Sequence, residues 1–376
     1  MEFDLSETQR MMQQSARKFL ARECPLGRVR QLMETATAID RPLWQAVAAQ
    51  GWIGLTISER WGGLGQGVVD LAAVSEELGR ACLPGPYLST LWAATLLDQS
   101  GHDALCAKYL PGLVEGRQLA TVALVEAEGD WAPSAVRLTA AASDGRVQLD
   151  GRKCFVGDAE AADVILCVAR GEKGLLLVCV EQGTPGVIIT PTPAIDATRK
   201  LYEVRFHRAQ VPAEQVLAAG PESASLLAAG TQVATVAACA ELVGVMGWIL
   251  EAAVSYVTTR TQFGRPVGSF QAVQHQCADM LLWTESARSA SYYAAWTVTV
   301  ADPAAPAGIS MAKAYCSDAA REVANRGIQV HGGIGFTWEH DLHLFYKRVR
   351  SLESLLGDSS YHRELLAQYL VDMPAA

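Results

Sequence analysis

The hydrophobic pattern of this 376-residue chain changes period twice, and that change constrains the fold more than any other feature. Up to about residue 118 the apolar residues recur at helical spacing. The next hundred residues consist of short apolar runs separated by turns, and helical patterns then return and continue to the end. We therefore predict an α+β multidomain protein with an α-helical domain at 1–118, a β domain at 119–215 and a helical bundle at 216–376.

The first domain has a clear helix start and several helix breakers. Ser6 and Gln9 have the spacing of a capping box and predict a helix over 7–22. Further helices are expected over 42–50 and 68–80 and in a segment that ends near Ser100.

The middle domain is predicted to be an antiparallel β-barrel or sandwich. Ser143-Asp144-Gly145 lies between two apolar runs, which is a hairpin signal. The expected strands are 136–142, 146–149, 164–168, 175–180, 187–190 and 202–206. No segment of helix length interrupts them, which argues against a βαβ sheet.

The last domain is predicted to be a four-helix bundle. Its expected helices are 228–259, 266–297, 307–326 and 360–370. The first is rich in Ala and Val on nearly every face, so we expect it to be buried.

Composition excludes several classes of partner. The net charge of −9 argues against a nucleic-acid partner. The nine cysteines are scattered without a CxxC pair, which favours free thiols in a reducing compartment over disulfides or zinc. We expect no apolar run of membrane-spanning length, no membrane association and no signal peptide, so the expected location is the cytoplasm.

Two segments of the last domain have the chemistry of a ligand site. The segment 260–266 (Arg-Thr-Gln-Phe-Gly-Arg-Pro) places Arg260 after a long helix and before a turn, where its guanidinium can bind a pyrophosphate. The segment 331–335 (His-Gly-Gly-Ile-Gly) offers backbone N–H groups to a ligand. The alternatives are a helix-ending arginine and an ordinary turn. His331 is predicted to be structural, and no metal site is expected.

These two segments, with 61–65 (Trp-Gly-Gly-Leu-Gly) and 76–80 (Glu-Glu-Leu-Gly-Arg), resemble the acyl-CoA dehydrogenases over essentially the whole chain. The resemblance implies FAD as cofactor and desaturation of the α,β-bond of a CoA thioester, with hydride transfer to flavin N5. It implies cofactor contacts at Arg260, Gln262, Phe263, Gln271, Gln329, Gly332 and Gly333, of which Arg260 and Gln262 would reach the FAD of a neighbouring subunit. It also implies flavin contacts in the β domain at Val125, Phe155 and Gly157.

The β domain departs from the family pattern at these positions. Val125 stands where the family usually has a threonine, and Gly157 also replaces a threonine. Phe155 preserves an aromatic wall. Each neutral hydrogen bond that is lost weakens binding by roughly 1 kcal/mol, so cofactor binding is weakened rather than excluded.

The usual catalytic base is also absent. The family glutamate of the C-terminal loop corresponds to Leu356, and the alternative base position on the long helix corresponds to Ala234. Glu241 lies two turns after Ala234 on the same helix face, within an apolar segment, and is the preferred candidate for the base. The alternative is that Glu241 is a buried glutamate paired with an arginine of another helix. Asp358 would have to point differently from the family residue, and Glu353 is expected to be solvated or ion-paired.

Three functional hypotheses remain. The chain is a dehydrogenase with a displaced base, a half-site subunit of a heteromeric dehydrogenase, or an acyl-CoA-binding or redirected flavoprotein. The motifs that act across subunits are kept while those within the chain are degraded, which is the pattern expected when a partner chain completes the site. A dimer or tetramer, homomeric or heteromeric, is expected. The resemblance also implies an electron-transfer flavoprotein as acceptor and a role in fatty-acid or steroid side-chain catabolism.

Overall fold

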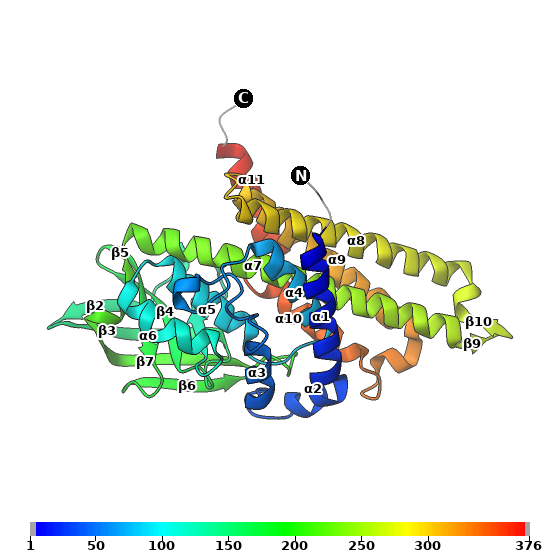
Figure 1. Ribbon diagram of the computed structural model, residues 1–376, viewed down its shortest axis with the longest axis horizontal. Helices are drawn as coiled ribbons and strands as arrows, with labels where there is room; N and C mark the ends of the chain where they lie inside the picture. The colour runs from blue at the N-terminus through cyan, green and yellow to red at the C-terminus, as the bar shows by residue number, and fades with distance from the viewer. Residues whose placement is uncertain (1–4, 373–376) are drawn as a thin grey trace. The chain divides into compact units, whose positions relative to one another are not determined.

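The computed structural model describes residues 5–372. Its first helices begin and end close to the predicted positions: α1 (Glu7–Glu23), α3 (Arg41–Ala48), α4 (Val68–Arg80) and α5 (Tyr87–Gln99) (Figure 1). The capping box is confirmed, because Ser6 Oγ accepts from Gln9 N and Gln9 Oε1 accepts from Ser6 N. Among the described residues before the β domain, the elements that were not predicted are α2 (Leu26–Met33), η1 (Glu59–Trp61) and α6 (Asp103–Val114).

The middle of the chain forms one sheet of eight strands. The strands are β1 (Ala120–Ala123), β2 (Thr139–Ser143), β3 (Arg146–Gly157), β4 (Val164–Gly171), β5 (Gly174–Glu181), β6 (Val187–Thr192), β7 (Leu201–Pro212) and β8 (Val216–Ala219), with η2 (Pro133–Ala135) and η3 (Ala213–Gln215) as 3₁₀ turns. The order is β6-β7-β3-β2-β4-β5-β8, and β1 pairs with β4. The sheet is mixed rather than purely antiparallel, because β1 and β2 both pair with β4 in parallel.

The C-terminal part is helical, as predicted. It contains α7 (Pro221–Thr259), the short pair β9 (Thr261–Gln262) and β10 (Arg265–Pro266), η4 (Val267–Ser269), α8 (Gln271–Thr299), α9 (Ala305–His331), η5 (Gly332–Phe336), α10 (Leu342–Ser354) and α11 (Ser359–Asp372). Figure 1 shows α8 in yellow and the later helices in orange and red. Helix α8 begins later than predicted because residues 261–269 form the β9–β10 pair and a 3₁₀ turn.

Among the described residues, one helix, α7, is long and apolar enough to cross a membrane by length and composition. The expectation that no apolar run reaches this length therefore does not hold. In the structure, 83% of its most apolar 18-residue stretch is buried inside the protein, as in the core helix of a bundle.

The contacts divide the chain into two compact units that are each discontinuous in sequence. Unit 1 holds the residues up to Arg30, Val68–Leu83 and the residues from Thr235 onward. Unit 2 holds Gln31–Gly67 and Pro84–Ala234. The three consecutive domains predicted from the sequence stay a prediction, and the two units are described one at a time below.

Within unit 1, helices α4 and α7 cross with almost no space between their backbones. A Cβ atom added at Gly79 of α4 would lie 2.0 Å from the carbonyl oxygen of Glu241. A Cβ atom added at Gly244 of α7 would lie 1.8 Å from the carbonyl oxygen of Glu76. Only glycine fits at both positions, so this crossing fixes where Glu241 and the acids of α4 lie.

Candidate functional site

Glu241, the predicted base, lies in unit 1 and is paired with an arginine. Its Oε1 accepts a hydrogen bond of 2.6 Å from Arg348 Nη1 of α10. Both side chains are buried, with 5% and 0% of their surface exposed. Arg348 Nη2 also donates to the carbonyl of Leu83 at 3.0 Å. This is the second of the two alternatives for Glu241, a buried glutamate held by an arginine of another helix.

The helices around this pair are packed by aromatic side chains as well as by charges. Trp248 of α7 stacks on Phe345 of α10 with ring centroids 3.6 Å apart and an interplanar angle of 6°. Phe345 lies one turn before Arg348, so the stacked rings fix the spacing of the two helices that carry the ion pair. Glu241 is therefore held in its pair by rigid elements.

Helix α4 carries two more buried acids beside the crossing. Glu77 accepts two hydrogen bonds from Arg17 of α1, at 2.8 Å from Nε and 2.7 Å from Nη2. Glu76 accepts from Arg288 Nε at 3.1 Å and from Tyr292 Oη at 3.0 Å. Burial raises the pKa of Glu76. Both acids are held by side chains of neighbouring helices, which marks them as structural.

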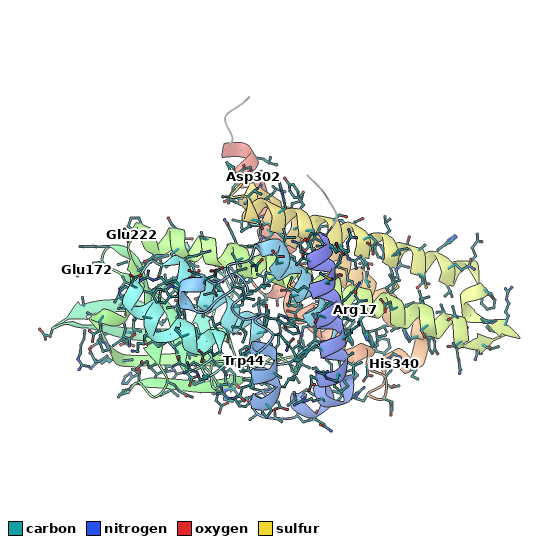
Figure 2. All side chains as sticks on the ribbon, in the orientation of Figure 1. Arg17, Trp44, Glu172, Glu222, Asp302 and His340 are labelled. Carbon is teal, nitrogen blue, oxygen red and sulfur yellow. The ribbon has the colours of Figure 1, made fainter. Side chains whose placement is uncertain are left out.

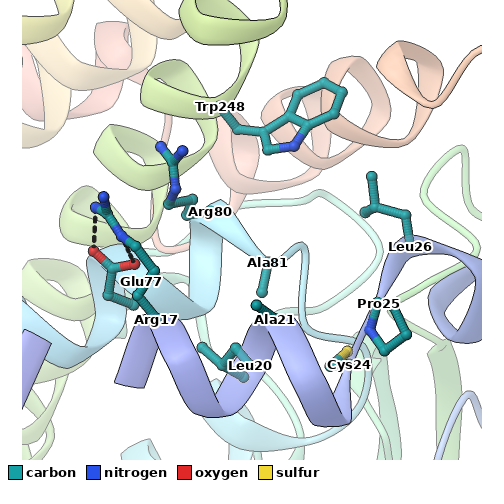
Figure 3. Close-up of a pocket in the computed structure, with 10 residues that line it drawn as sticks. All are labelled: Arg17, Leu20, Ala21, Cys24, Pro25, Leu26, Glu77, Arg80, Ala81 and Trp248. Carbon is teal, nitrogen blue, oxygen red and sulfur yellow. Dashed lines mark hydrogen bonds and ion pairs between the residues drawn. The ribbon is translucent and has the colours of Figure 1, made fainter. Parts of the chain in front are cut away.

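Two cavities of unit 1 lie beside these acids. Arg17 and Glu77 line a cavity of about 180 Å³ whose other walls include Leu20, Cys24 and Trp248 (Figure 3). Figure 2 labels Arg17 on α1. A cavity of about 750 Å³ is lined by residues of α1, α4 and α8. None of the cofactor residues predicted from the sequence lines either cavity.

Leu356, at the family position of the base, lies in a tight turn between α10 and α11. Its backbone has φ 61° and its side chain is 2% exposed, and Gly357 follows with φ 97°. Lys313 of α9 donates from Nζ to the carbonyls of Glu353 at 3.0 Å and Gly357 at 2.8 Å. His362 Nε2 donates to the carbonyl of Leu356 at 2.9 Å. The turn is thus fixed by two buried side chains.

The remaining acids near the base positions have structural partners. Asp358 Oδ1 accepts from the backbone N–H of Tyr361 at 2.8 Å and so caps α11. Glu353 is buried and forms ion pairs with Arg321 and, at 2.5 Å, with Arg350. Ion pairing of Glu353 was predicted. Ala234 is buried in α7 without a group that could take a proton.

The two glycine-containing segments of the last domain lie at the same end of unit 1. Tyr256 of α7 stacks on His331 of α9 with ring centroids 4.6 Å apart. Tyr256 lies one turn before Arg260, and its carbonyl accepts from Arg260 N at 2.8 Å. The structure therefore brings together Arg260 and the Gly332 loop, which are 72 residues apart in the sequence.

The predicted cofactor residues at this end are exposed. Phe263, at the tip of the β9–β10 pair, is 92% exposed, and Phe336 of η5 is 78% exposed. The exposed predicted residues are Arg260, Gln262, Phe263, Gln271, Gln329, Gly332 and Gly333. An added Cβ atom at Gly332 or Gly333 would meet nothing within 4 Å, so the backbone there is open to a ligand. Gly332 has φ 65°, which favours glycine.

The predicted flavin residues of the β domain lie in unit 2 and are more enclosed. Val125 is 4% exposed and its carbonyl accepts from Cys154 N at 2.8 Å. The next residue, Glu126, accepts from Lys153 Nζ at 2.8 Å and from the backbone N–H groups of Arg137 and Leu138 at 2.9 Å each. Burial alone would raise the pKa of Glu126, but these hydrogen bonds lower it. Glu126 therefore connects the loop after β1 to Lys153 of β3 and to the backbone at Arg137 and Leu138.

The end of β3 has an exposed ring and a glycine in close packing. Phe155 is 46% exposed and has φ 56°. A Cβ atom added at Gly157 would lie 2.8 Å from Ser89 Oγ, and the Gly157 carbonyl accepts from Thr121 Oγ1 at 2.6 Å. A side chain at position 157 would therefore require the Ser89 hydroxyl of α5 to move.

Two family models match the chain. The N-terminal domain of acyl-CoA dehydrogenase matches residues 6–117, and its C-terminal domain matches residues 226–371. The chain belongs to the acyl-CoA dehydrogenase family.

Individual acyl-CoA dehydrogenases and related structures agree with this assignment. Acyl-CoA dehydrogenase IpdE2 of Mycolicibacterium smegmatis is 30% identical over 355 residues, which cover 94% of this chain and 96% of that protein. The ChsE4-ChsE5 complex from Mycobacterium tuberculosis contains a chain with a TM-score of 0.92 and 27% identity, with full coverage of both chains. The FAD complex of PigA has a TM-score of 0.92 and 25% identity over 99% of both chains.

As a member of the acyl-CoA dehydrogenase family, the chain is an acyl-CoA oxidoreductase by type, and its cofactor is FAD. The exposed loops of unit 1 fit such a ligand, because Arg260 is accessible and the Gly332 backbone is open. In unit 2 an exposed ring is present at Phe155, but the hydroxyl donors are replaced at Val125 and Gly157. Within residues 5–372 there is no group of three or more His, Cys, Asp or Glu side chains that could hold a metal ion.

Three buried basic residues were missed from the sequence. Arg348 lies between Phe345 and Leu352 on the buried face of α10, so helical periodicity could have placed it opposite α7. Lys313 lies beside Ala312 and Cys316 on the buried face of α9. Lys153 lies at an inward position of β3.

Proposed function

We propose that this chain is the base-lacking subunit of a heteromeric, FAD-dependent acyl-CoA dehydrogenase that desaturates the α,β-bond of a CoA thioester. The observation that carries the proposal is the state of the candidate bases. Leu356 and Ala234 cannot take a proton, and Glu241 is held in a buried ion pair with Arg348. The α-proton is then removed by a carboxylate of a related partner chain.

We also propose that this chain completes the partner's cofactor site. The support comes from the exposed end of unit 1, which consists of residues 260–271 and 329–336. Arg260 would bind the FAD pyrophosphate through its guanidinium. Gln262, Gln329 and the N–H groups at Gly332 and Gly333 would bind further polar groups of the cofactor, with Gln271 beside them. The exposed rings of Phe263 and Phe336 would be covered by the partner chain, because aromatic side chains are enriched in protein interfaces.

The reaction divides between the two chains. The partner's carboxylate removes the α-proton, and the electron pair of that C–H bond forms the new C=C bond as the β-hydrogen leaves with its electron pair. When bound, FAD supplies the hydride acceptor. This chain contributes binding and orientation through the exposed loop end of unit 1. An electron-transfer flavoprotein is the proposed acceptor of the electrons.

Heteromeric assembly has a precedent among the similar structures, since the ChsE4-ChsE5 complex consists of two differently named chains. For the present chain we propose a dimer or tetramer that contains a related chain with a glutamate before the glycine of the C-terminal loop.

The first experiment measures the FAD-to-chain ratio of the chain purified alone and after co-expression with such a related chain, together with the mass in solution. We expect little FAD on the chain alone and a heteromer that retains FAD. One FAD per chain in a homo-oligomer that desaturates acyl-CoA would contradict the proposal.

A self-sufficient dehydrogenase with Glu241 as base is the second candidate, favoured by the position of Glu241 on the buried face of α7 that also carries Ala234. This candidate requires Glu241 to leave Arg348 in the bound state. If it holds, Glu241→Gln abolishes α-proton exchange of acyl-CoA in deuterated water. Exchange that continues in this variant excludes Glu241 as the base.

A further inference from the structure

Three histidines lie around the segment 332–341, which connects α9 to α10 within unit 1. His331 is the last residue of α9, His340 lies near the end of the segment, and His343 lies in the first turn of α10. The ring centroids of His331 and His340 are 4.7 Å apart, and the ring of His343 lies 4.6 Å from that of Trp338. We call His331, His340 and His343 the histidine cluster.

The hydrogen bonds of the histidine cluster require neutral rings. His331 Nδ1 donates to the carbonyl of Gly327 at 2.7 Å, while its Nε2 is buried and has no partner within residues 5–372. His340 Nδ1 accepts from Leu342 N at 3.1 Å, which is possible only while Nδ1 carries no proton. His343 is 8% exposed, and neither of its ring nitrogens has a partner in the described part of the chain. A second proton on any of these rings therefore removes an acceptor or buries a charged donor without a partner.

Arg30 and Lys347 hold the segment from two sides. Arg30 Nε forms an ion pair of 2.6 Å with Asp341 Oδ1, and Arg30 Nη1 donates to the carbonyl of Trp338 at 2.7 Å. Lys347 Nζ lies 3.9 Å from the ring centroid of Trp338, whose ring also contacts His343. The titratable and charged side chains that face the histidine cluster or its neighbour Arg30 are those of Arg30, Tyr256, Glu339, Asp341 and Lys347.

The folded structure disfavours a proton on each ring of the cluster. Burial is the largest cause, and it lowers the pKa of all three histidines. The charge of Arg30 lowers the pKa of His340 and His343 further. Lys347 adds to this effect at His343, and Asp341 opposes it at both rings. A histidine in an open segment has a pKa of about 6.5, so the contribution of the neutral cluster is complete above about pH 6.5 and is lost as the pH falls from there.

We propose that the histidine cluster is a pH-sensitive switch: its neutral rings hold the segment 332–341 in the observed conformation, and mildly acidic pH releases the segment and weakens ligand binding at the exposed end of unit 1. A proton on His340 removes the acceptor for Leu342 N at the start of α10. A further proton on His331 places two charged rings beside each other. The effect on ligand binding rests on the proposed function, whereas the release of the segment is a property of this chain alone.

The switch is tested on the isolated full-length chain by hydrogen exchange of the peptide that covers residues 332–342, at pH 7.5 and pH 5, with rates corrected for the intrinsic effect of pH. In the parent we expect the protection of this peptide to fall by about tenfold at pH 5, because each ring regains its ordinary pKa once the segment opens. The double variant His340→Asn/His343→Leu should retain most of its protection at pH 5. An asparagine side chain can accept from Leu342 N without titrating, and a leucine can pack against Trp338.

His102→Asn is the matched control for this comparison. His102 Nδ1 also accepts from a backbone N–H, that of Leu105 at 3.3 Å, but at the start of α6 in unit 2. This variant should lose protection in 332–342 at pH 5 as the parent does. The single variants His340→Asn and His343→Leu should each lie between the parent and the double variant, and they give the same comparison if the double variant is unstable. An equal loss in the parent and in all three of these variants overturns the switch, as does full protection of the parent at pH 5.

The effect on ligand binding is tested with the co-expressed heteromer loaded with FAD. The FAD-to-chain ratio is measured after gel filtration at pH 7.5 and at pH 5. At pH 5 we expect the heteromer with the parent chain to retain severalfold less FAD than the heteromer with the double variant. Equal loss of FAD from both heteromers overturns the effect on ligand binding. If no heteromer holds FAD at pH 7.5, the proposed function is contradicted instead, and the hydrogen exchange of the isolated chain decides whether the switch exists.

Discussion

Glu241 and Arg348 form a charged pair inside a helical bundle, and each depends on the other for its solvation. Neither side chain has more than 5% of its surface exposed. A buried pair gains little relative to an apolar pair of the same size, but the loss of one member leaves an uncompensated charge. The loss of either side chain alone is therefore expected to destabilise unit 1.

Arg348→Met should lower the free energy of unfolding by about 3–5 kcal/mol, because the Glu241 carboxylate is left buried without its partner. The measurement is urea denaturation followed by circular dichroism. The double variant Glu241→Gln/Arg348→Met removes both charges and should be more stable than Arg348→Met alone. A double variant that is as unstable as the sum of the two single variants would mean that the residues do not interact.

His362 makes the stability of the C-terminal turn depend on pH. Burial, with the nearby positive charge of Lys313 as a second cause, lowers the pKa of His362 to about 4. A histidine in the unfolded chain has a pKa of about 6.5, so the folded state disfavours the proton. The contribution of neutral His362 is therefore complete above about pH 6.5 and is lost progressively as the pH falls from there toward 4.

His362→Gln should weaken this pH dependence, because the glutamine amide can donate to the Leu356 carbonyl and does not titrate. The test compares urea unfolding of both proteins at pH 7.5 and pH 5. We expect the parent to lose more stability than the variant between the two, by an amount on the order of 2 kcal/mol. His331, His340 and His343, whose pKa values burial also lowers, remain in both proteins and cancel in the comparison. An identical loss of unfolding free energy in both proteins would mean that His362 does not cause the pH dependence.

At the scale of the elements, the crossing of α4 and α7 depends on the absence of side chains. Gly244→Ala places a methyl group against the carbonyl of Glu76, where the Cβ distance would be 1.8 Å. The helices must separate, and we expect a loss of about 1–3 kcal/mol or more in the free energy of unfolding.

Gly247→Ala is the matched control on the same helix. Its Cβ atom would be no closer than 3.7 Å to Arg80 Nη1, an ordinary contact. Since alanine is a better helix former than glycine by about 1 kcal/mol, this variant should be as stable as the parent or more stable. Chemical denaturation of the two variants side by side provides the comparison, and equal destabilisation of both would show that the crossing is not the cause.

The elements that the sequence predicted well are those with a long, regular pattern. Helix α4 was predicted at its observed bounds, and α1 within one residue. Helix α2 has only eight residues, and β1 is a short strand of four buried residues whose pairing with β4 is parallel and non-local. Helix α10 was not predicted, although its buried residues Phe345, Val349 and Leu352 have helical spacing.

At the scale of the whole molecule, the exposed end of unit 1 should matter for the assembly and its cofactor more than for the fold of the chain. Arg260→Ala is therefore expected to reduce the FAD retained by the assembled protein, with an unchanged melting temperature of the isolated chain. Flavin absorbance after denaturation measures the ratio of FAD to chain. Arg22→Ala, at a side chain that is 74% exposed on α1, is the control and should retain the parental flavin content. Unchanged flavin in Arg260→Ala would remove Arg260 from the cofactor site.

The sequence was sufficient to indicate the family and the loops at 260–266 and 331–335, because each of these loops is a short motif of consecutive residues. It could not decide the role of Glu241, because the answer depends on Arg348, which is 107 residues away and meets Glu241 only through the packing of α7 against α10. The role of Lys313 likewise depends on two backbone carbonyls that no sequence pattern encodes.

The division of the chain into two interleaved units has a consequence for its biosynthesis. The chain passes between the units after residues 30, 67, 83 and 234, and α7 belongs to both. When synthesis reaches the end of unit 2 at Ala234, only the two shorter segments of unit 1 have been made. The largest segment of unit 1 begins at Thr235 and follows last. Helices α1 and α4 can pack against each other early, but α8, which also packs against α4, is synthesised only later. Neither unit can therefore be obtained as one uninterrupted fragment of the chain.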